Sequence, residues 1–262
     1  MRRLSAVILL LLAACATPPI ILSPVYELGD RRTYKLEADA TTTIELGGDR
    51  QRQRTLLRAR STIEIVSLEG ATTTIRLTLS PTSFARDGRA VDPPPEQRAE
   101  LVLGPDGEVR SIRSVGDVPA EIIGADVQEL APLLGSPLPS GRVRLGETWE
   151  TPVPGPTDQP GAGDGRQRGR VDGARVVQGY DCATVVLATR RPLVRQRPIG
   201  DQTLLLAGIE TSATEIAFAF REGFAVEIHT TSEGTFQVGD VAFSGGTVTI
   251  VSRTDLVLVG QR

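Results

Sequence analysis

The chain has very few of the side chains on which most catalytic and metal sites are built. Its 262 residues include one histidine and two cysteines. A single histidine, His229, cannot form the paired-histidine ligand sets of common zinc sites. The sequence also lacks the signatures of phosphate loops, dinucleotide-binding turns and serine-hydrolase elbows. We predict a protein that is not an enzyme and holds no metal or cofactor. A hydrolase based on His229 or on a pair of carboxylates that meets in the folded chain is the alternative.

Long apolar runs are also missing. Arg2 and Arg3 precede a run of apolar residues over 6–12, which is shorter than the roughly 20 residues that span a bilayer. A basic start, a short apolar run and small residues after it are typical of a secretory signal peptide. The sequence Leu12-Ala13-Ala14-Cys15 resembles the lipobox of bacterial lipoproteins. The resemblance implies cleavage between Ala14 and Cys15, a thioether-linked diacylglycerol on Cys15 and an acyl group, such as palmitate, on its new amino terminus.

This resemblance implies the organisation and the location of the chain. Residues 1–14 would be the signal peptide, 15–29 a lipidated tether and 30–262 a β-rich domain. Two or more acyl chains anchor a protein stably in a membrane. Because Ala16 rather than Asp follows Cys15, the resemblance implies the outer membrane, facing the periplasm, in a diderm host. The alternative is an ordinary secretory signal in which the cysteine is incidental.

The scarcity of cysteine and lysine argues against two classes of protein, those stabilised by disulfides and those that bind nucleic acid. With Cys15 lipidated, Cys182 has no partner for a disulfide, so the exported domain needs a hydrophobic core large enough to fold alone. We interpret Cys182, within the apolar run 182–187, as a small buried side chain. Lys35 is the only lysine and the formal net charge is −3. This mild acidity argues against binding to nucleic acid, which requires a basic surface.

Alternating apolar and polar residues dominate the chain from Tyr34 onward. The alternation places His229 on the polar face of its strand, opposite Phe224 and Ile228. Turn-forming pairs or triplets separate the alternating runs, at Glu69-Gly70, Asp87-Gly88, Pro105-Asp106-Gly107, Gln178-Gly179, Glu222-Gly223, Glu233-Gly234 and Gly245-Gly246. The pattern predicts a mainly β fold, with a large curved antiparallel sheet or half-barrel of about eleven or twelve strands. One face of this sheet should be apolar and the other solvated.

One segment has helical periodicity. Apolar residues recur at intervals of three and four between Asp117 and Leu134, which predicts an amphipathic helix over about 118–134 that rests on the apolar face of the sheet. The helix region 117–135 separates half 1, about 30–116, from half 2, about 140–262. The order of strands and turns is similar in the two halves, which predicts duplicated β-meanders; chance similarity between hairpins is the alternative. The prolines and glycines of residues 151–170 predict a flexible loop.

Two further features have competing interpretations. Arginines alternate along residues 50–60 and recur at Arg190, Arg191, Arg195 and Arg197. Both groups could bind phosphates; we favour a solvated outer face on which acids of neighbouring strands balance them. Trp149 is the only tryptophan, and we favour a core anchor over a ligand-stacking residue.

Short motifs add a second resemblance. The strand Tyr34-Lys35-Leu36, the Asp-Gly and Glu-Gly hairpins and the stretch from Gly146 to Trp149 are similar to those of β-rich bacterial envelope lipoproteins. The layout also resembles lipoprotein-carrier domains, in which a curved antiparallel sheet closes over helices around an apolar cavity. The resemblance implies a non-catalytic, membrane-anchored module that binds a lipid or another hydrophobic ligand. The candidate ligand-binding residues are Ile63, Ile65, Leu77, Phe218 and Phe220. The alternative is a structural or adaptor lipoprotein that binds an envelope protein.

Overall fold

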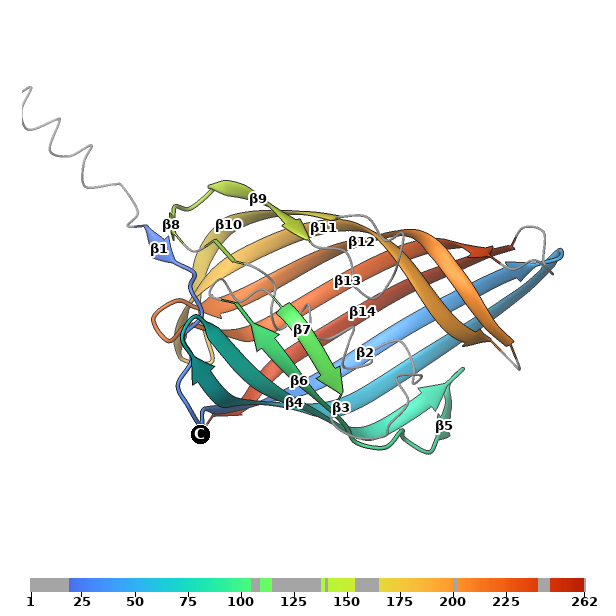
Figure 1. The fold of residues 1–262 in the computed structure, drawn as a ribbon, viewed down its shortest axis with the longest axis horizontal. Helices are drawn as coiled ribbons and strands as arrows, with labels where there is room; N and C mark the ends of the chain where they lie inside the picture. The colour runs from blue at the N-terminus through green and yellow to red at the C-terminus, as the bar shows by residue number, and fades with distance from the viewer. Residues whose placement is uncertain are drawn as a thin grey trace, which may run out of the picture.

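Strands make up the regular structure of the residues that are described (Figure 1). The computed structural model describes residues 19–104, 109–114, 138–139, 141–153, 165–199, 202–239 and 246–261. Twelve strands form one antiparallel sheet, and the remaining two, β1 (Ile20–Ile21) and β8 (Arg142–Val143), pair with each other. The mainly β class and the size of the sheet are as predicted. The signal peptide, Cys15 and the predicted helix lie outside the described residues.

The large sheet consists of two meanders. The first contains β2 (Arg31–Leu46), β3 (Asp49–Glu69), β4 (Thr72–Arg86), β6 (Gln97–Leu103) and β7 (Val109–Ser114), with the short β5 (Arg89–Val91) paired to β4. The second contains β9 (Thr148–Val153), β10 (Gly165–Val177), β11 (Tyr180–Ile199), β12 (Gln202–Ala219), β13 (Phe224–Gly239) and β14 (Gly246–Gln261).

Pairing of β14 with β2 joins the meanders into one sheet. The strand order is β7-β6-β4-β3-β2-β14-β13-β12-β11-β10-β9, and the sheet curves along this order (Figure 1). It is not closed, because β7 and β9 stand at opposite ends of the order and each pairs on one side only among the described strands. Two meanders therefore exist as predicted; their origin by duplication stays a prediction.

Four of the predicted hairpin turns are present. Asp87-Gly88, Gln178-Gly179 and Glu222-Gly223 lie between consecutive strands, and Glu69-Gly70 covers the last residue of β3 and the first residue of the turn to β4. Asp87 and Gln178 have φ of 51° each, and the glycine after each one also has a positive φ, as tight two-residue hairpins require. Gly246 begins β14, while Gly245 and the triplet 105–107 lie outside the described residues.

The predicted turn at Glu233-Gly234 is wrong, because both residues lie within β13. A Cβ atom at Gly234 would lie 2.6 Å from the ring of Phe236. The glycine therefore gives space to a neighbouring aromatic ring, which sequence pattern alone does not distinguish from a turn.

The predicted flexible loop over 151–170 is also wrong at both ends. Residues 151–153 belong to β9 and 165–170 to β10; residues 154–164 lie outside the described part. A Cβ at Gly165 would lie 2.7 Å from Cβ of Arg191, and a Cβ at Gly169 would lie 2.2 Å from the Trp149 ring. These glycines are strand residues that admit close packing.

The predicted tether over 15–29 is shorter than expected. Ile20 and Leu22 are buried in the core. The N–H of Val25 donates to the carbonyl of Gly223 over 2.9 Å, and the N–H of Gly29 donates to the carbonyl of Ile65 over 3.0 Å. From Ile20 onward the segment is therefore held across one end of the sheet by the burial of Ile20 and Leu22 and by these backbone hydrogen bonds. We call this end, where β1 and the β12–β13 turn lie, the proximal end, and the end with the β2–β3 turn the distal end.

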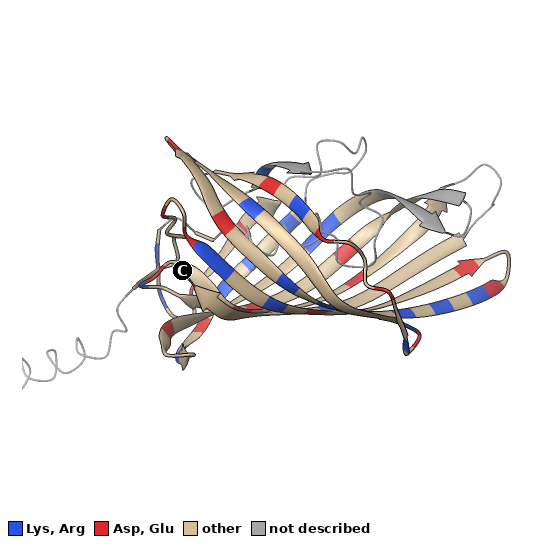
Figure 2. Ribbon diagram, turned by 90° about the horizontal axis from the view of Figure 1, so that it is seen from below, with Lys and Arg blue, Asp and Glu red and all other residues tan. Residues whose placement is uncertain are grey.

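The outward positions of the strands are mostly polar, and charged residues are distributed along the sheet (Figure 2). Three of the alternating arginines form ion pairs with acids of the adjacent β2: Arg54 with Asp39, Arg58 with Glu37 and Arg50 with Glu45. The hydrogen bonds from Arg54 lower the pKa of the Asp39 carboxyl. The predicted balance of arginines by acids on a neighbouring strand is confirmed.

Candidate functional site

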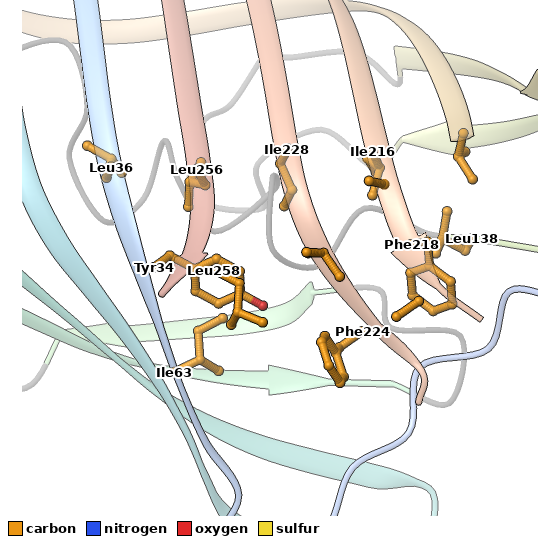
Figure 3. Close-up of a cluster of buried hydrophobic side chains, with 14 of the residues drawn as sticks. Tyr34, Leu36, Ile63, Leu138, Ile216, Phe218, Phe224, Ile228, Leu256 and Leu258 are labelled. Carbon is orange, nitrogen blue, oxygen red and sulfur yellow. The ribbon is translucent and has the colours of Figure 1, made fainter. Parts of the chain in front are cut away.

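The inner face, which is the buried side of the curved sheet, is the candidate site. At its proximal end, cross-strand pairing places one apolar side chain from each of six successive strands side by side. We call these residues the apolar row: Val171, Val185, Ile216, Ile228, Leu256 and Leu36 (Figure 3). Each is at most 3% exposed. β-Branched and leucine side chains at alternate positions produce this continuous surface, as the sequence pattern predicts.

The five predicted ligand-binding residues come together at this end of the sheet. Ile63, Ile65, Leu77 and Phe218 are buried members of the same hydrophobic cluster as the apolar row, and Phe220 is partly buried against it. Ile63 and Leu77 are direct partners across β3 and β4. The structure thus unites residues from both halves of the chain, while their contact with a ligand stays a prediction.

Buried polar groups close the proximal end. The hydroxyl of Tyr34 donates to the carbonyl of Ala225 over 2.9 Å, and burial raises the pKa of Tyr34 to about 12. The guanidinium of Arg32 pairs with Asp30 at 2.9 Å and lies over the ring of Phe224, 4.7 Å from its centroid. These contacts tie β2 to β13 and to the segment before β2, so this end of the site is firmly held.

Polar side chains cross the inner face beyond the apolar row, toward the distal end. Along β14 the inward positions change from Leu256 to Thr254 and Ser252, and β13 changes in the same way. We call the resulting two rows the polar belt: Thr214, Thr230 and Thr254 in the first row, and Gln167, Thr189, Ser212, Ser232 and Ser252 in the second.

Hydrogen bonds link neighbours within the polar belt. The hydroxyls of Thr214 and Thr230 are 3.0 Å apart, and those of Ser232 and Ser252 are 2.8 Å apart. Thr189 donates to the side-chain oxygen of Gln167 over 3.3 Å. Sequence analysis missed the belt, because threonine and serine at alternate positions also fit a solvated face. The available signal was that these residues continue the apolar alternation of the same strands.

An ion pair and a second apolar cluster follow the belt. Arg191 and Glu210 are 2.8 Å apart, with side chains only 22% and 14% exposed. The predicted position of Arg191 on the solvated outer face is therefore wrong, because it shares the inward face of β11 with Val185 and Thr189. Beyond them lies the distal cluster, which consists of Leu193, Leu206, Phe236, Val238 and Val248. Along the strands, the inner face is therefore apolar, then polar, then apolar again.

His229 lies on the outer face, opposite Ile228, as predicted. Its Nδ1 is 2.7 Å from an oxygen of Asp255, and its Nε2 is 3.8 Å from Glu227. Partial burial acts to raise the pKa of Asp255, but hydrogen bonds from His229 and Arg253 outweigh it, so this pKa is lowered. The histidine is thus one member of a network of charged residues on a solvated face.

Other candidates for chemistry are few. Cys182 is fully buried in the core, and burial raises the pKa of its thiol, which fits the predicted packing role. Across the described ranges, no group of three or more His, Cys, Asp or Glu side chains is arranged to hold a metal ion. A pocket lined by Glu150, Pro152, Gly165 and Arg166 lies between β9 and β10, away from the apolar row. The residues that the structure describes contain no helix of the length and apolarity needed to cross a membrane.

Comparisons with known proteins give distant structural neighbours, of which two are described here. No family model and no curated protein matches the chain. A structure of lipovitellin, solved to study lipid–protein interactions, aligns with 13% identity and a TM-score of 0.46, over 91% of this chain and 26% of that chain. A domain from Vibrio parahaemolyticus described as an outer membrane lipoprotein-sorting protein aligns with 8% identity and a TM-score of 0.17, over 89% of this chain and 85% of that one. This chain spans about a quarter of the length of the lipovitellin chain.

Proposed function

We propose that the chain is a non-catalytic, membrane-anchored module of the cell envelope that binds a lipid or another hydrophobic ligand on its inner face. The observation that carries this proposal is the apolar row, which continues across six strands of an open sheet. Each methylene group transferred from water to such a surface contributes roughly 0.8 kcal/mol. Burial of an acyl chain along the row would therefore favour binding, against the cost of separating the side chains that cover the row.

The open sheet gives such a ligand a way in. The apolar row is buried, so a ligand reaches it only if the walls of the curved sheet move apart. In a closed sheet this movement would break hydrogen bonds between strands. Here β7 and β9 are not paired with each other, so the curvature can relax while the ladders stay intact.

The proposed anchor lies close to the proximal end. With lipid on Cys15, four residues, 16–19, separate the anchor from Ile20, which is fixed in the core. The five Cα–Cα steps from Cys15 to Ile20 span at most about 17 Å. The site would therefore lie next to the membrane surface, on the periplasmic side of the outer membrane in a diderm host.

The adaptor alternative is the weaker one. It needs an edge strand or an exposed apolar patch that receives a protein partner. The edge strand β9 carries Glu150 and Pro152, and β7 carries Arg110 and Arg113. Charged residues and proline at sheet edges oppose pairing with another chain. Recovery of one protein partner in constant ratio, with no lipid, would support this alternative.

The test uses the full chain with Cys15→Ser, which carries no covalent acyl chain. The protein is purified without detergent and extracted with organic solvent, and the extract is analysed by mass spectrometry. We expect a lipid in near-stoichiometric amount and, after extraction and refolding, saturable binding of the apolar dye N-phenyl-1-naphthylamine. Absence of both the lipid and dye binding would refute the proposal.

Two adjacent valines provide matched variants. Val185 belongs to the apolar row, while Val186 points to the outer face, and both lie in β11. Val→Thr keeps the shape and adds one hydroxyl. We expect Val185→Thr to weaken dye binding by about five- to tenfold, because a hydroxyl in an apolar contact costs about 1 kcal/mol or more. Val186→Thr should leave binding unchanged; equal effects of the two variants would place the ligand elsewhere.

A further inference from the structure

The change in polarity along the inner face has a direct bearing on the ligand. Successive inward positions of a strand are about 7 Å apart, so the two rows of the polar belt begin about one step from the apolar row. The members of the second row on β12, β13 and β14 are half-buried, whereas those of the apolar row are fully buried. A ligand that extends beyond the apolar row toward the distal end would contact hydroxyl and amide groups.

The polar belt has hydrogen-bond donors and acceptors that are not used by its own side chains. A hydroxyl has one donor and two acceptor positions, so the Ser232–Ser252 pair keeps one donor and several acceptor positions after its mutual bond. Trp149 lies in the same cross-strand row as Thr214, with Gly169 and Leu187 between them, and is two positions along this end of the sheet from the row of Gln167. Its indole N–H is buried and has no hydrogen-bond partner among the described residues. A buried donor without a partner is uncommon in folded proteins, and this one lies at the border of the belt.

The polar belt carries no net charge. Its side chains are neutral, and the adjacent Arg191 is paired with Glu210 at 2.8 Å. An anionic headgroup placed here would have to compete with Glu210 for the guanidinium. Neutral donors and acceptors instead match a headgroup with hydroxyls, amides or balanced charges.

We propose that the ligand of the inner face is an amphiphile whose uncharged or zwitterionic headgroup hydrogen-bonds to the polar belt while its apolar chain lies along the apolar row. This inference rests on the proposed function and deepens it, because it names the class of ligand. A purely apolar molecule that reached the belt would remove water from its hydroxyls without replacing their hydrogen bonds, which is unfavourable. An amphiphile replaces those bonds with its own.

The test compares two molecules with the same chain. The full chain with Cys15→Ser is loaded with N-phenyl-1-naphthylamine, and the dye is displaced by 1-lauroylglycerol or by methyl laurate. The glycerol ester adds two hydroxyls to the same acyl group. We expect 1-lauroylglycerol to displace the dye at a concentration about tenfold lower, the gain that two modest hydrogen bonds supply. Dodecyl phosphate should be no tighter than 1-lauroylglycerol; tighter binding by tenfold would overturn the assignment of an uncharged or zwitterionic headgroup.

Paired variants on the same two strands locate the effect. Ser232→Ala with Ser252→Ala removes an inward pair, and because both partners of one bond are removed the fold should tolerate it. Thr235→Ala with Thr249→Ala removes a directly paired couple on the outer face of β13 and β14. We expect the inward pair of substitutions to reduce the tenfold preference to about threefold or less, and the outward pair to leave it unchanged. Trp149→Phe, which removes the indole N–H and keeps a ring, should also reduce the preference.

The outcomes separate the two proposals. If both esters bind equally to the unchanged chain, or if the inward variant keeps the preference, the headgroup assignment is wrong while hydrophobic binding stands. If neither ester displaces the dye, the proposed function itself fails. Circular dichroism of each variant shows whether it is folded at the temperature of the assay.

Discussion

Trp149 and Gly169 provide a sharp test of the packing at the edge of the site. The two residues are partners across β9 and β10. A Cβ added to Gly169 would lie 2.2 Å from Cε2 and Cζ2 of the Trp149 ring and 2.7 Å from its Nε1. Carbon atoms in contact are normally about 3.5–4.0 Å apart. Gly169→Ala must therefore move the indole ring by more than 1 Å or displace β9, which has a strand partner on one side only.

The expected magnitude follows from two opposing effects. Forcing extra volume into a packed position costs about 1–3 kcal/mol. Replacing glycine by alanine also restricts the unfolded chain, which stabilises a protein by about 0.4–1 kcal/mol where the backbone conformation allows it. We expect Gly169→Ala to lower the free energy of unfolding by about 0.5–2.5 kcal/mol. With Trp149→Ala present, the same substitution should be neutral or stabilising.

The assay is urea unfolding followed by far-ultraviolet circular dichroism, because two of the four proteins in the cycle lack the only tryptophan. The coupling energy between the two substitutions should be about 1–3 kcal/mol. Gly173→Ala, on the same strand, is the control, since nothing lies within 4 Å of a Cβ at that position. If Gly169→Ala and Trp149→Ala are additive within about 0.5 kcal/mol, the ring does not lie over the glycine and the arrangement is refuted.

Three further predictions concern the inner face. Burial raises the pKa of Tyr34 from 10.0 to about 12. The contribution of Tyr34 to the free energy of unfolding is therefore complete below pH 10 and is lost as the pH rises toward 12, by up to about 2.7 kcal/mol. Tyr34→Phe should remove this loss, and a free energy of unfolding that does not change over this pH range in the unchanged chain would contradict the burial. Ser61→Ala should be neutral or stabilising by about 1 kcal/mol, because the buried hydroxyl has no partner among the described residues; a clear loss in urea unfolding would show that it has one. In a stearoylglycerol, a nitroxide at carbon 5 should quench Trp149 fluorescence more than one at carbon 16, and the reverse order would contradict the proposed orientation of the headgroup.

The alternation of the sequence was sufficient to predict the two faces of the sheet. It assigned Ile63, Ile65 and Leu77 to the buried side, and His229 to the solvated side of β13. Alternation has this predictive value because successive side chains of a strand point to opposite faces, so each position depends only on its neighbours. The number of strands followed from counting these runs between turns.

The glycines were the main source of error, because glycine has two unrelated uses. At Gly70 and Gly179 it adopts a positive φ in a turn, and these turns were predicted. At Gly169 and Gly234 it gives space to the rings of Trp149 and Phe236. The second use depends on where an aromatic side chain points. For Gly169 that side chain comes from another strand, and for Gly234 it comes from two residues further along the same strand. Local composition does not reveal either direction.

The polar belt was not predictable for a related reason. A serine at an alternate position is read as solvated unless the strand register is known. Ser252 faces Ser232 on one side and Ala40 on the other, and only this register shows that the polar positions are aligned across several strands. Buried apolar positions, in contrast, can be predicted from the residue type alone, without knowledge of the strand register.

The open edges and the polar belt together bear on selectivity. If the walls of the sheet can separate, the volume over the apolar row is adjustable, and chains of different length can be accommodated at similar cost. The belt is fixed by continuous ladders from β10 to β2, so the position of the headgroup is not adjustable. A site of this kind should discriminate among headgroups more strongly than among chain lengths. Glu150 and Pro152 on the edge strand β9 disfavour pairing with another chain. The sheet can therefore stay open without binding a second copy of the chain. The walls of the sheet then remain able to move when a ligand binds.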